Sequence, residues 1–272
     1  MRIAFIIPAA GSSRRYIEAS KASTGGELER QKIDEDLGGR PLLHRTVELF
    51  NKLEETHTII VAGPADAERY DQFKSRHADK LAILGVQFCQ GGRDHRYETV
   101  ANALKLVPAD CTHVAVHDAA RPATPADVID RVIDAAKSGH KAVIPAVDVA
   151  DTLKRVSAEV VTSKEADPLA AILGASAPKP GARRVEQTID RTRLVGVQTP
   201  QLFERELLLR AYAQKDLTST DDAQLIERLG EPVMVVDGDP VNIKVTRPRD
   251  LVLVRAILGH RPPTDKPAHM RF

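Results

Sequence analysis

The sequence has few cysteines, no excess of either charge and no apolar run long enough to cross a membrane. Cys89 and Cys111 lie far apart and outside any CxxC spacing, so neither a disulfide nor a zinc site is expected. Lys and Arg number 39 against 38 Asp and Glu, a net charge of +1, so no global charge draws the chain to nucleic acid or to an anionic membrane. The first residues carry no basic leader with an apolar segment behind it. The sequence therefore predicts a cytoplasmic protein without nucleic-acid or membrane partners.

Two common nucleotide-binding motifs are also absent. No GxxxxGK[ST] segment occurs, and the segment Pro8–Arg15 contains one glycine only, where a dinucleotide fingerprint needs three. The strand-like segment Thr58–Val61 ends in Ala62-Gly63 rather than in the acidic residue that binds a dinucleotide ribose. A NAD enzyme is therefore disfavoured, and a nucleoside triphosphate is the preferred ligand.

Alternating strand-like and helix-like segments are the main pattern that is present. With 272 residues and 42% hydrophobic content, the chain can bury the core of one large α/β domain. Val- and Ile-rich runs alternate with stretches of helical apolar spacing, which is typical of a mostly parallel twisted sheet covered by helices. Thr124 and Pro125 are expected to open the fourth helix, and Gly139 to end it. Strands are expected at 2–8, 57–62, 85–89, 112–117, 141–147 and 232–236, and helices at 41–55, 65–80, 95–107, 125–138, 203–214, 220–229 and 248–258.

The alternation breaks after Val147. Large apolar residues become scarce there, and two polar strand-like pieces flank a stretch rich in Ala, Pro, Gly and Ser. Because such a segment does not bury a core of its own, we expect residues 148–198 to form an arm that leaves a single domain spanning 1–260. Residues 261–272 are expected to be a disordered tail.

The segment PAAGSSRR, Pro8–Arg15, is the strongest local feature because it follows the first expected strand. Small residues let a ligand approach the backbone amides, and Arg14 and Arg15 add fixed positive charge, which together suit a polyphosphate. A small-residue turn with two solvated arginines is the alternative. Lys32 follows a polar insertion and precedes the helix that opens near Pro41, so it is a candidate for the same pocket, although most lone lysines are solvated.

Two other expected strands end in residues suited to ligands. A Gly-Gly pair ending at Gly92 precedes a helix start that contains Thr99, and a base or ribose fits over such a turn; a plain turn is the alternative. The segment VHDAARP ends an apolar strand, where open α/β sheets bind ligands. Asp118 is suited to Mg²⁺ or a substrate hydroxyl and Arg121 to a phosphate, whereas an Asp–Arg pair across the turn is the alternative.

Lys244 lies in the apolar segment Asn242–Thr246, which reads as a strand. A partly buried lysine on a strand needs an anionic partner, so Lys244 is a stronger candidate than a surface lysine. The segment Asp237-Gly238-Asp239 imitates the DxD of metal-dependent glycosyltransferases, but its glycine and the proline that follows favour a turn.

Together these segments resemble the methylerythritol phosphate cytidylyltransferase family of the non-mevalonate isoprenoid pathway. The combination of VHDAARP with NIKVTRP is specific, whereas PAAG alone is shared with many nucleotidyltransferases. The resemblance implies a single Rossmann-like nucleotidyltransferase domain, with a protruding β-arm that pairs with a second copy in a homodimer. It runs in order from residue 2 to about 258, through PAAGSSRR, GGRD…ETV, VHDAARP, DTLKR, TIDR…QTPQLF, TDDA and NIKVTRPRDL.

The resemblance also implies residue roles. Arg15 and Lys32 match transition-state stabilisers on the triphosphate, and Arg191 and Lys244 match the pair that positions the attacking phosphate. Arg191 and Thr152 both lie on the arm, so both would complete the pocket of the neighbouring subunit. The sugar-phosphate pocket matches Asp118, Arg121 and Thr152, and the CTP site matches Ala9, Ala10, Gly11, Gly92, Thr99 and Ala119.

The sequence departs from the family pattern in three places. The stretch between Arg15 and Lys32 is longer than usual and lacks the Pro-Lys-Gln-Tyr context of the family lysine, so Lys21 competes with Lys32. An extra position after Gly92 leaves open which neighbouring residue faces the nucleotide. An insertion at 162–187 leaves Arg191 anchored only by its distance from the QTPQ segment.

The activity implied by the resemblance is transfer of CMP from CTP to 2-C-methyl-D-erythritol 4-phosphate, with release of pyrophosphate. Mg²⁺ is the expected cofactor, held mainly by the CTP phosphates rather than by protein ligands. The nearest alternative is a ribitol 5-phosphate cytidylyltransferase on the same scaffold. More distant alternatives are a glycosyltransferase that uses Asp239 and a non-catalytic regulator that binds CTP.

Overall fold

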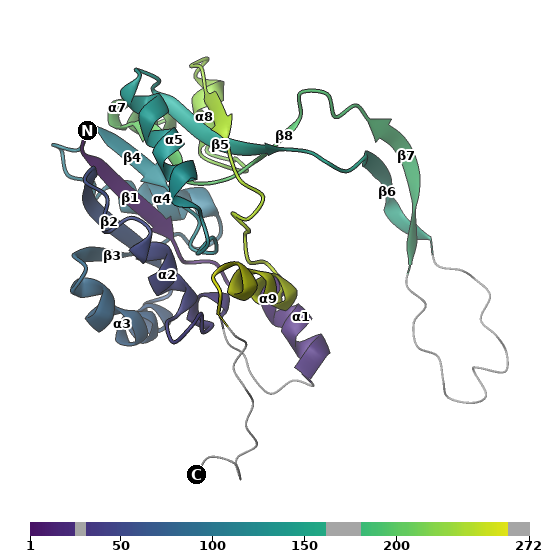
Figure 1. Cartoon of the computed structure of the whole chain (residues 1–272), viewed down its shortest axis with the longest axis horizontal. Helices are drawn as coiled ribbons and strands as arrows, with labels where there is room; N and C mark the ends of the chain where they lie inside the picture. The colour runs from purple at the N-terminus through teal and green to yellow at the C-terminus, as the bar shows by residue number, and fades with distance from the viewer. Residues whose placement is uncertain (25–30, 162–180, 261–272) are drawn as a thin grey trace, which may run out of the picture. The chain divides into compact units, whose positions relative to one another are not determined.

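The structure is a computed structural model that describes residues 1–24, 31–161 and 181–260, with side chains left out at 21–24 (Figure 1). The chain divides into two compact units. Unit 1 comprises residues 1–147 and the chain from 197 onward, and unit 2 comprises residues 148–196. The tail expected at 261–272 lies outside the described residues.

The sheet of unit 1 is mostly parallel, as expected. Its strands follow the order β10-β5-β9-β4-β1-β2-β3. The pairs β1–β2, β1–β4, β2–β3 and β5–β10 are parallel, whereas β9 runs antiparallel to both β4 and β5. The bounds are β1 Ile3–Pro8, β2 Thr56–Gly63, β3 Val86–Gln90, β4 His113–Val116, β5 Ala142–Asp148, β9 Gln201–Glu204 and β10 Met234–Asp237.

Helices cover both faces of this sheet, and the alternation of side chains along β1 shows why. Ile3, Phe5 and Ile7 join a core cluster with α2, α3 and α5, whereas Ala4 and Ile6 join a second cluster with α4, α7 and α8. The sheet is thus the middle of three layers (Figure 1). The helices are α2 Leu42–Glu48, α3 Ala67–Ala82, α4 Arg96–Leu104, α5 Ala126–Lys137, α7 Arg205–Tyr212 and α8 Ala223–Arg228.

A third cluster joins α1 (Arg14–Thr24) to α9 (Pro248–Ile257). Tyr16 of α1 and Leu251 of α9 are buried in it together with Val245. The helix α1 is not among the expected helices, because its sequence is polar. A short 3₁₀ helix, η1 (Lys32–Asp34), follows the undescribed residues 25–30.

Two predicted helix starts in unit 1 were wrong. The segment before α7 forms the strand β9, which the sequence pattern merged into a helix from residue 203. Thr124 does not cap α5, because Pro125 occupies the cap position and Ala126 begins the helix. Gly139 does end α5 as expected, with φ of 100°.

Unit 2 contains an antiparallel pair, β6 (Leu153–Val161) with β7 (Ala182–Ile189). The strand β8 (Val195–Val197) spans the boundary between the units. The strands predicted in this segment are therefore present, and most of their residues are exposed. Part of the insertion at 162–187 lies among residues that the structure does not describe.

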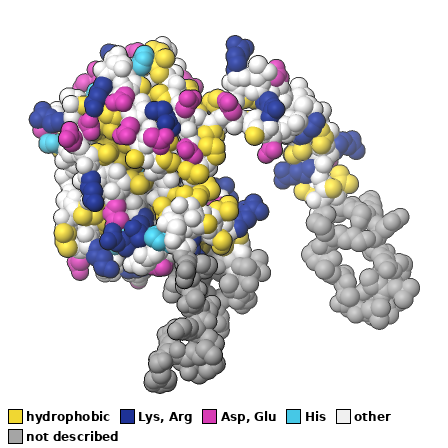
Figure 2. All heavy atoms as spheres, viewed as in Figure 1, with side chains coloured by type: hydrophobic (Ala, Val, Ile, Leu, Met, Phe, Trp, Pro, Cys, Tyr) yellow, Lys and Arg dark blue, Asp and Glu magenta, His cyan; other side chains and the backbone are white. Residues whose placement is uncertain are grey.

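The surface of unit 1 carries both charges. On the face drawn in Figure 2, Lys and Arg side chains are interspersed with Asp and Glu. Within the described part of the chain, no helix has the length and apolarity needed to cross a bilayer.

Candidate active site

A cavity of about 530 Å³ lies at the carboxyl ends of the parallel strands of unit 1. The chain reaches it shortly after β1, β3 and β4, at Ala9, Gly92 and Asp118. Open α/β sheets bind ligands at this edge, because the strands there deliver loops and helix starts to one place.

Most of the residues expected at a site line this cavity. Arg15 instead lines an adjoining cavity of about 510 Å³, which also includes Gly11 and Lys32. Arg121 lies buried behind Asp118. The expected residues that line the main cavity are Ala9, Ala10, Gly11, Lys32, Gly92, Thr99, Asp118, Ala119 and Lys244.

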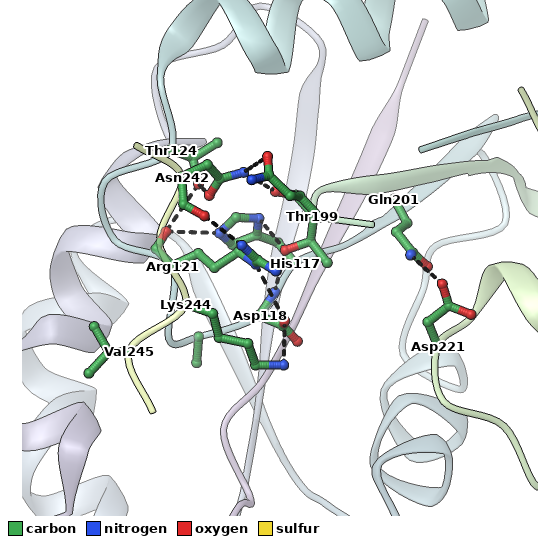
Figure 3. Close-up of polar contacts among 12 residues, drawn as sticks. His117, Asp118, Arg121, Thr124, Thr199, Gln201, Asp221, Asn242, Lys244 and Val245 are labelled. Atoms are coloured by element: carbon green, nitrogen blue, oxygen red, sulfur yellow. Dashed lines mark hydrogen bonds and ion pairs between the residues drawn. The ribbon is translucent and has the colours of Figure 1, made fainter. Parts of the chain in front are cut away.

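Asp118 is the electrostatic centre of the cavity (Figure 3). Its carboxylate lies 2.8 Å from Lys244 Nζ, 3.5 Å from Arg96 Nε and 3.6 Å from Arg121 Nε. Burial alone would raise the pKa of Asp118, but Arg96, Lys244 and Arg121 outweigh it and hold the pKa well below its usual value. The carboxylate is therefore ionised at neutral pH, and the surrounding cations exceed it in charge.

Lys244 has the anionic partner that the sequence argument required, namely Asp118. The expected strand at 242–246 was wrong, however. Val245 N donates to Ala120 O outside any ladder, and the segment is irregular. The buried apolar neighbours belong to the third core cluster, while the side chain of Lys244 is 41% exposed and faces the cavity. A loop, not a strand, presents this lysine.

His117 and Thr199 hold the loop that carries Asp118 (Figure 3). His117 Nε2 lies 3.1 Å from Arg121 O, so this nitrogen donates and Nδ1 accepts from Thr199 Oγ1 at 3.1 Å. Thr199 Oγ1 in turn accepts from Asp118 N at 3.1 Å. Burial lowers the pKa of His117 to about 4, so the ring is neutral. The His117 side chain is fully buried, so it supports the backbone of the loop and does not contact a ligand.

Arg96 is a cavity residue that the sequence argument missed. It begins α4 and joins Asp118 to Asp222, whose Oδ2 lies 2.7 Å from Arg96 NH1. Tyr212 donates its hydroxyl to Asp222 Oδ1 at 2.5 Å. Burial disfavours the charged guanidinium, but Asp222 and Asp118 together raise the pKa of Arg96. The sequence did contain a signal for Arg96, because this residue lies three residues before Thr99. A single arginine, however, is weak evidence for a ligand site.

Lys32 reaches the cavity from η1. Its Nζ donates to Val245 O at 3.2 Å. Burial and then the charge of Lys244 lower the pKa of Lys32 to about 8. The competing lysine, Lys21, has its backbone in α1, and its side chain is not among those described.

The turn after β3 has no room for larger residues. Gly92 N donates to Thr99 Oγ1 at 2.9 Å, which joins two residues expected at the nucleotide site. A Cβ at Gly91 would lie 2.7 Å from both Ala10 Cβ and Gly63 O. This glycine therefore lets the loops after β1 and β3 approach each other. The residues left open after Gly92, Arg93 and Asp94, both line the cavity.

Thr152 and Arg191 belong to unit 2. Arg191 is exposed, and its NH1 donates to Val149 O at 2.9 Å and to Ala150 O. The cavity of unit 1 is therefore described without them.

Oxygen ligands for a metal are few in the cavity. Asp66, Asp94 and Asp118 line it. Asp66 accepts from Arg69 N at the start of α3, and Asp118 is paired with cations. Mg²⁺ often uses one or two carboxylates and completes its shell with phosphate oxygens and water, so this cavity fits a metal that arrives with a phosphorylated ligand.

Two other groups do not contribute to the cavity. Asp239 accepts from Val241 N in a turn and does not line the cavity, so the glycosyltransferase alternative has no support. Among the described residues, His57, Asp110 and Cys111 place potential ligand atoms within 4.8 Å of one another. They lie near the amino ends of β2 and β4, away from the cavity. Cys111 is buried and Cys89 half-buried, and both thiols are free.

The fold and the cavity place the chain among α/β proteins that bind phosphorylated ligands at the carboxyl edge of a parallel sheet. Comparison with known proteins narrows this class. The family model described as IspD, 2-C-methyl-D-erythritol 4-phosphate cytidylyltransferase, matches residues 3–179 and 175–260. The chain belongs to this family, whose members are cytidylyltransferases.

Individual relatives support this family assignment. The 2-C-methyl-D-erythritol 4-phosphate cytidylyltransferase of Frankia casuarinae is 39% identical over 97% of this chain and 84% of its own length. The protein of the same name from Streptomyces coelicolor is 37% identical over 96% of this chain and 86% of its own. The crystal structure of the Thermus thermophilus protein of that name superposes with a TM-score of 0.65 at 30% identity, covering 94% of this chain and 98% of the other.

Proposed function

We propose that this protein transfers CMP from CTP to 2-C-methyl-D-erythritol 4-phosphate, with Mg²⁺ as cofactor. The observation that carries the proposal is the set of cations around Asp118, since Lys244, Arg96 and Arg121 all lie within 3.6 Å of its carboxylate. Lys32 adds a further cation to the same cavity. This excess of positive charge suits two phosphorylated substrates, and the relatives are named for the same reaction.

The reaction needs no covalent nucleophile from the protein. An oxygen of the sugar phosphate forms a bond to the α-phosphorus of CTP, and the bond from that phosphorus to the oxygen that bridges to the β-phosphate breaks. Pyrophosphate leaves, and the product is 4-diphosphocytidyl-2-C-methyl-D-erythritol. The attacking phosphate is already anionic near neutral pH, so no general base is required. This agrees with the neutral, fully engaged state of His117.

Positioning and charge then supply most of the catalysis. Lys32 and Arg15 neutralise the triphosphate, while Lys244 and Arg191 hold the attacking phosphate. Asp118, Arg121 and Thr152 bind the sugar phosphate, and the small residues from Ala9 to Gly11, with Gly92, Thr99 and Ala119, leave room for the nucleotide. Mg²⁺, when bound, neutralises charge on the phosphate oxygens.

Arg191 and Thr152 belong to unit 2, so we further propose a homodimer in which unit 2 of each subunit completes the pocket of the other. We also propose that the protein is cytoplasmic.

The test is pyrophosphate release from CTP and Mg²⁺, with either 2-C-methyl-D-erythritol 4-phosphate or ribitol 5-phosphate as acceptor. We expect release with the former only, and about 10²–10³-fold slower turnover in Lys244→Ala, by analogy with the loss of one transition-state donor. Lys105→Ala, a substitution of the same kind on the lysine after α4, is the control and should retain wild-type turnover.

Other outcomes are equally informative. Release with ribitol 5-phosphate alone would keep the chemistry but replace the acceptor. No release with either acceptor, despite measurable CTP binding, would replace the proposal with a CTP-binding regulator.

A further inference from the structure

Asn242 lies two residues before Lys244 and is almost fully buried, at 1% exposure. It forms hydrogen bonds with two other segments of unit 1, the loop after β4 and the segment that precedes β9 (Figure 3). Its side-chain amide donates to Gln198 Oε1 at 3.1 Å and to Thr199 O at 3.0 Å. Its Oδ1 accepts from Thr124 Oγ1 at 2.8 Å. Both amide hydrogens and the carbonyl oxygen are thus engaged.

The backbone of Asn242 is also engaged. Its carbonyl oxygen accepts from Arg121 NH1 at 2.5 Å. Arg121 and Thr124 belong to the loop after β4 that carries Asp118, and Thr199 donates to the His117 ring that supports the same loop. Asn242 therefore ties the lysine loop to the loop after β4 and to the segment that precedes β9.

We propose that Asn242 is a positioning residue that holds Lys244 and Arg121 beside Asp118 for binding of the acceptor phosphate. The inference rests on the proposed function and deepens it. The segment 243–246 is irregular, so no strand ladder fixes the position of Lys244. Lys244 is itself 41% exposed, and among the described residues it forms an ion pair with Asp118 only. The bonds of Asn242 supply the constraint that a strand would have given.

Asn242→Asp is the sharpest substitution, because a carboxylate has the same shape as the amide but accepts only. It removes both donated bonds and turns an oxygen toward Gln198 Oε1 and Thr199 O. We expect kcat/KM for the acceptor to fall about 10²-fold, as when reacting groups shift by about 1 Å. The Kd for CTP should stay within about twofold, since the hydrogen bonds of Asn242 run to the loop after β4 and to the segment before β9 rather than to the turn at Gly92.

A purely structural role would instead weaken CTP binding and lower the melting temperature without separating the substrates. Asn51→Asp makes the same chemical change in the turn after α2, and serves as the matched control with wild-type kcat/KM. A second control concerns Lys244. In a Lys244→Ala background, Asn242→Asp should change kcat/KM by less than about threefold, because interacting residues are not additive.

If the Asn242→Asp protein does not fold, Thr124→Val tests the same positioning role. It removes the hydroxyl that donates to Asn242 Oδ1 and preserves the shape of the side chain. We expect about a fivefold loss in kcat/KM for the acceptor, the typical effect of one hydrogen bond.

Three results would overturn the positioning role: wild-type kcat/KM in a folded Asn242→Asp protein, wild-type kcat/KM in Thr124→Val, or an undiminished effect of Asn242→Asp without Lys244. Failure of the proposed function is a different result, because the wild-type protein itself would then release no pyrophosphate.

Discussion

Unit 1 and unit 2 differ in what holds their residues in place. In unit 1 the strands alternate between two buried clusters, and the residues of the cavity are fixed by buried hydrogen bonds and ion pairs. In unit 2 the strands β6 and β7 pair with each other, but nearly all their side chains are exposed. A two-stranded sheet without a buried face is marginally stable at best. The chain therefore separates a rigid part that forms a core from a part that needs other contacts for its stability.

The largest expected effect of this difference is on unfolding. Phe50 of unit 1 is fully buried and stacks on Phe5, with ring centroids 4.4 Å apart. Phe50→Ala should lower the free energy of unfolding by about 3–5 kcal/mol, because it leaves a cavity in the main core. Urea denaturation followed by circular dichroism measures this. A loss below about 1 kcal/mol would contradict the picture of unit 1 as the packed part.

Arg191 of unit 2 should matter for turnover and not for stability. We expect Arg191→Ala to slow turnover about 10²-fold, as for one lost transition-state contact. Its unfolding midpoint should match the wild type, because the side chain is exposed. Thr192→Ala, the neighbouring exposed position, is the control with wild-type turnover. A fully active Arg191→Ala would remove unit 2 from the site.

Subunit mixing tests how unit 2 contributes. If unit 2 completes the pocket of the partner, mixtures of Arg191→Ala and Lys244→Ala proteins contain dimers with one intact pocket. Random reassociation of equal amounts would then restore about a quarter of wild-type activity. Activity that remains at the level of the separate variants would argue for a pocket made within one subunit.

Lys32 predicts a pH dependence that belongs to unit 1 alone. Burial and the charge of Lys244 lower its pKa to about 8, so the free enzyme loses this positive charge as pH rises through about 8. We expect kcat/KM for CTP to fall above that pH, by at most about tenfold per pH unit. Lys32→Arg should shift the fall to higher pH, since arginine stays protonated. An unchanged profile in that variant would assign the fall to another group.

The smallest expected effect lies on the surface of unit 2. Val185 on β7 is 55% exposed. Val185→Ala should change the free energy of unfolding by no more than about 0.5 kcal/mol, in contrast to Phe50→Ala. A loss of 2 kcal/mol or more in the same urea assay would mean that this strand is covered in the assembled protein.

The fold was largely predictable because most strands of unit 1 are short apolar runs that alternate with stretches of helical apolar spacing. The six strands expected between residues 2 and 236 are each present within about two residues of their predictions, whereas the strand expected at 242–246 is an irregular segment. The strand β9 was not predicted because the helix α7 follows it at once, so the apolar residues of the two elements read as one pattern. The helix α1 was not predicted because its sequence is polar, with one buried aromatic residue, Tyr16.

The cavity was predictable where a residue follows a strand, as at Gly11, Gly92 and Asp118. The residues that join distant segments were not. Arg96 pairs with Asp222, 126 positions away, and Asn242 accepts from Thr124, 118 positions away. No local pattern encodes such partners, because the sheet order brings them together only when the fold is complete.

The placement of β9 has a consequence for how the chain tolerates change in length. The chain leaves unit 1 after β5 and returns through β9, and these strands are antiparallel neighbours, with Ala142 opposite Phe203 and Val143 opposite Leu202. In topological terms β5, unit 2 and β9 form one long hairpin, and its two stem strands lie inside the sheet between β10 and β4. Pairing between β5 and β9 fixes the two ends of the segment that connects them. The entropic cost of closing such a loop grows only slowly with its length. Residues can thus be gained or lost in unit 2 without a change in the register of the sheet that holds the cavity.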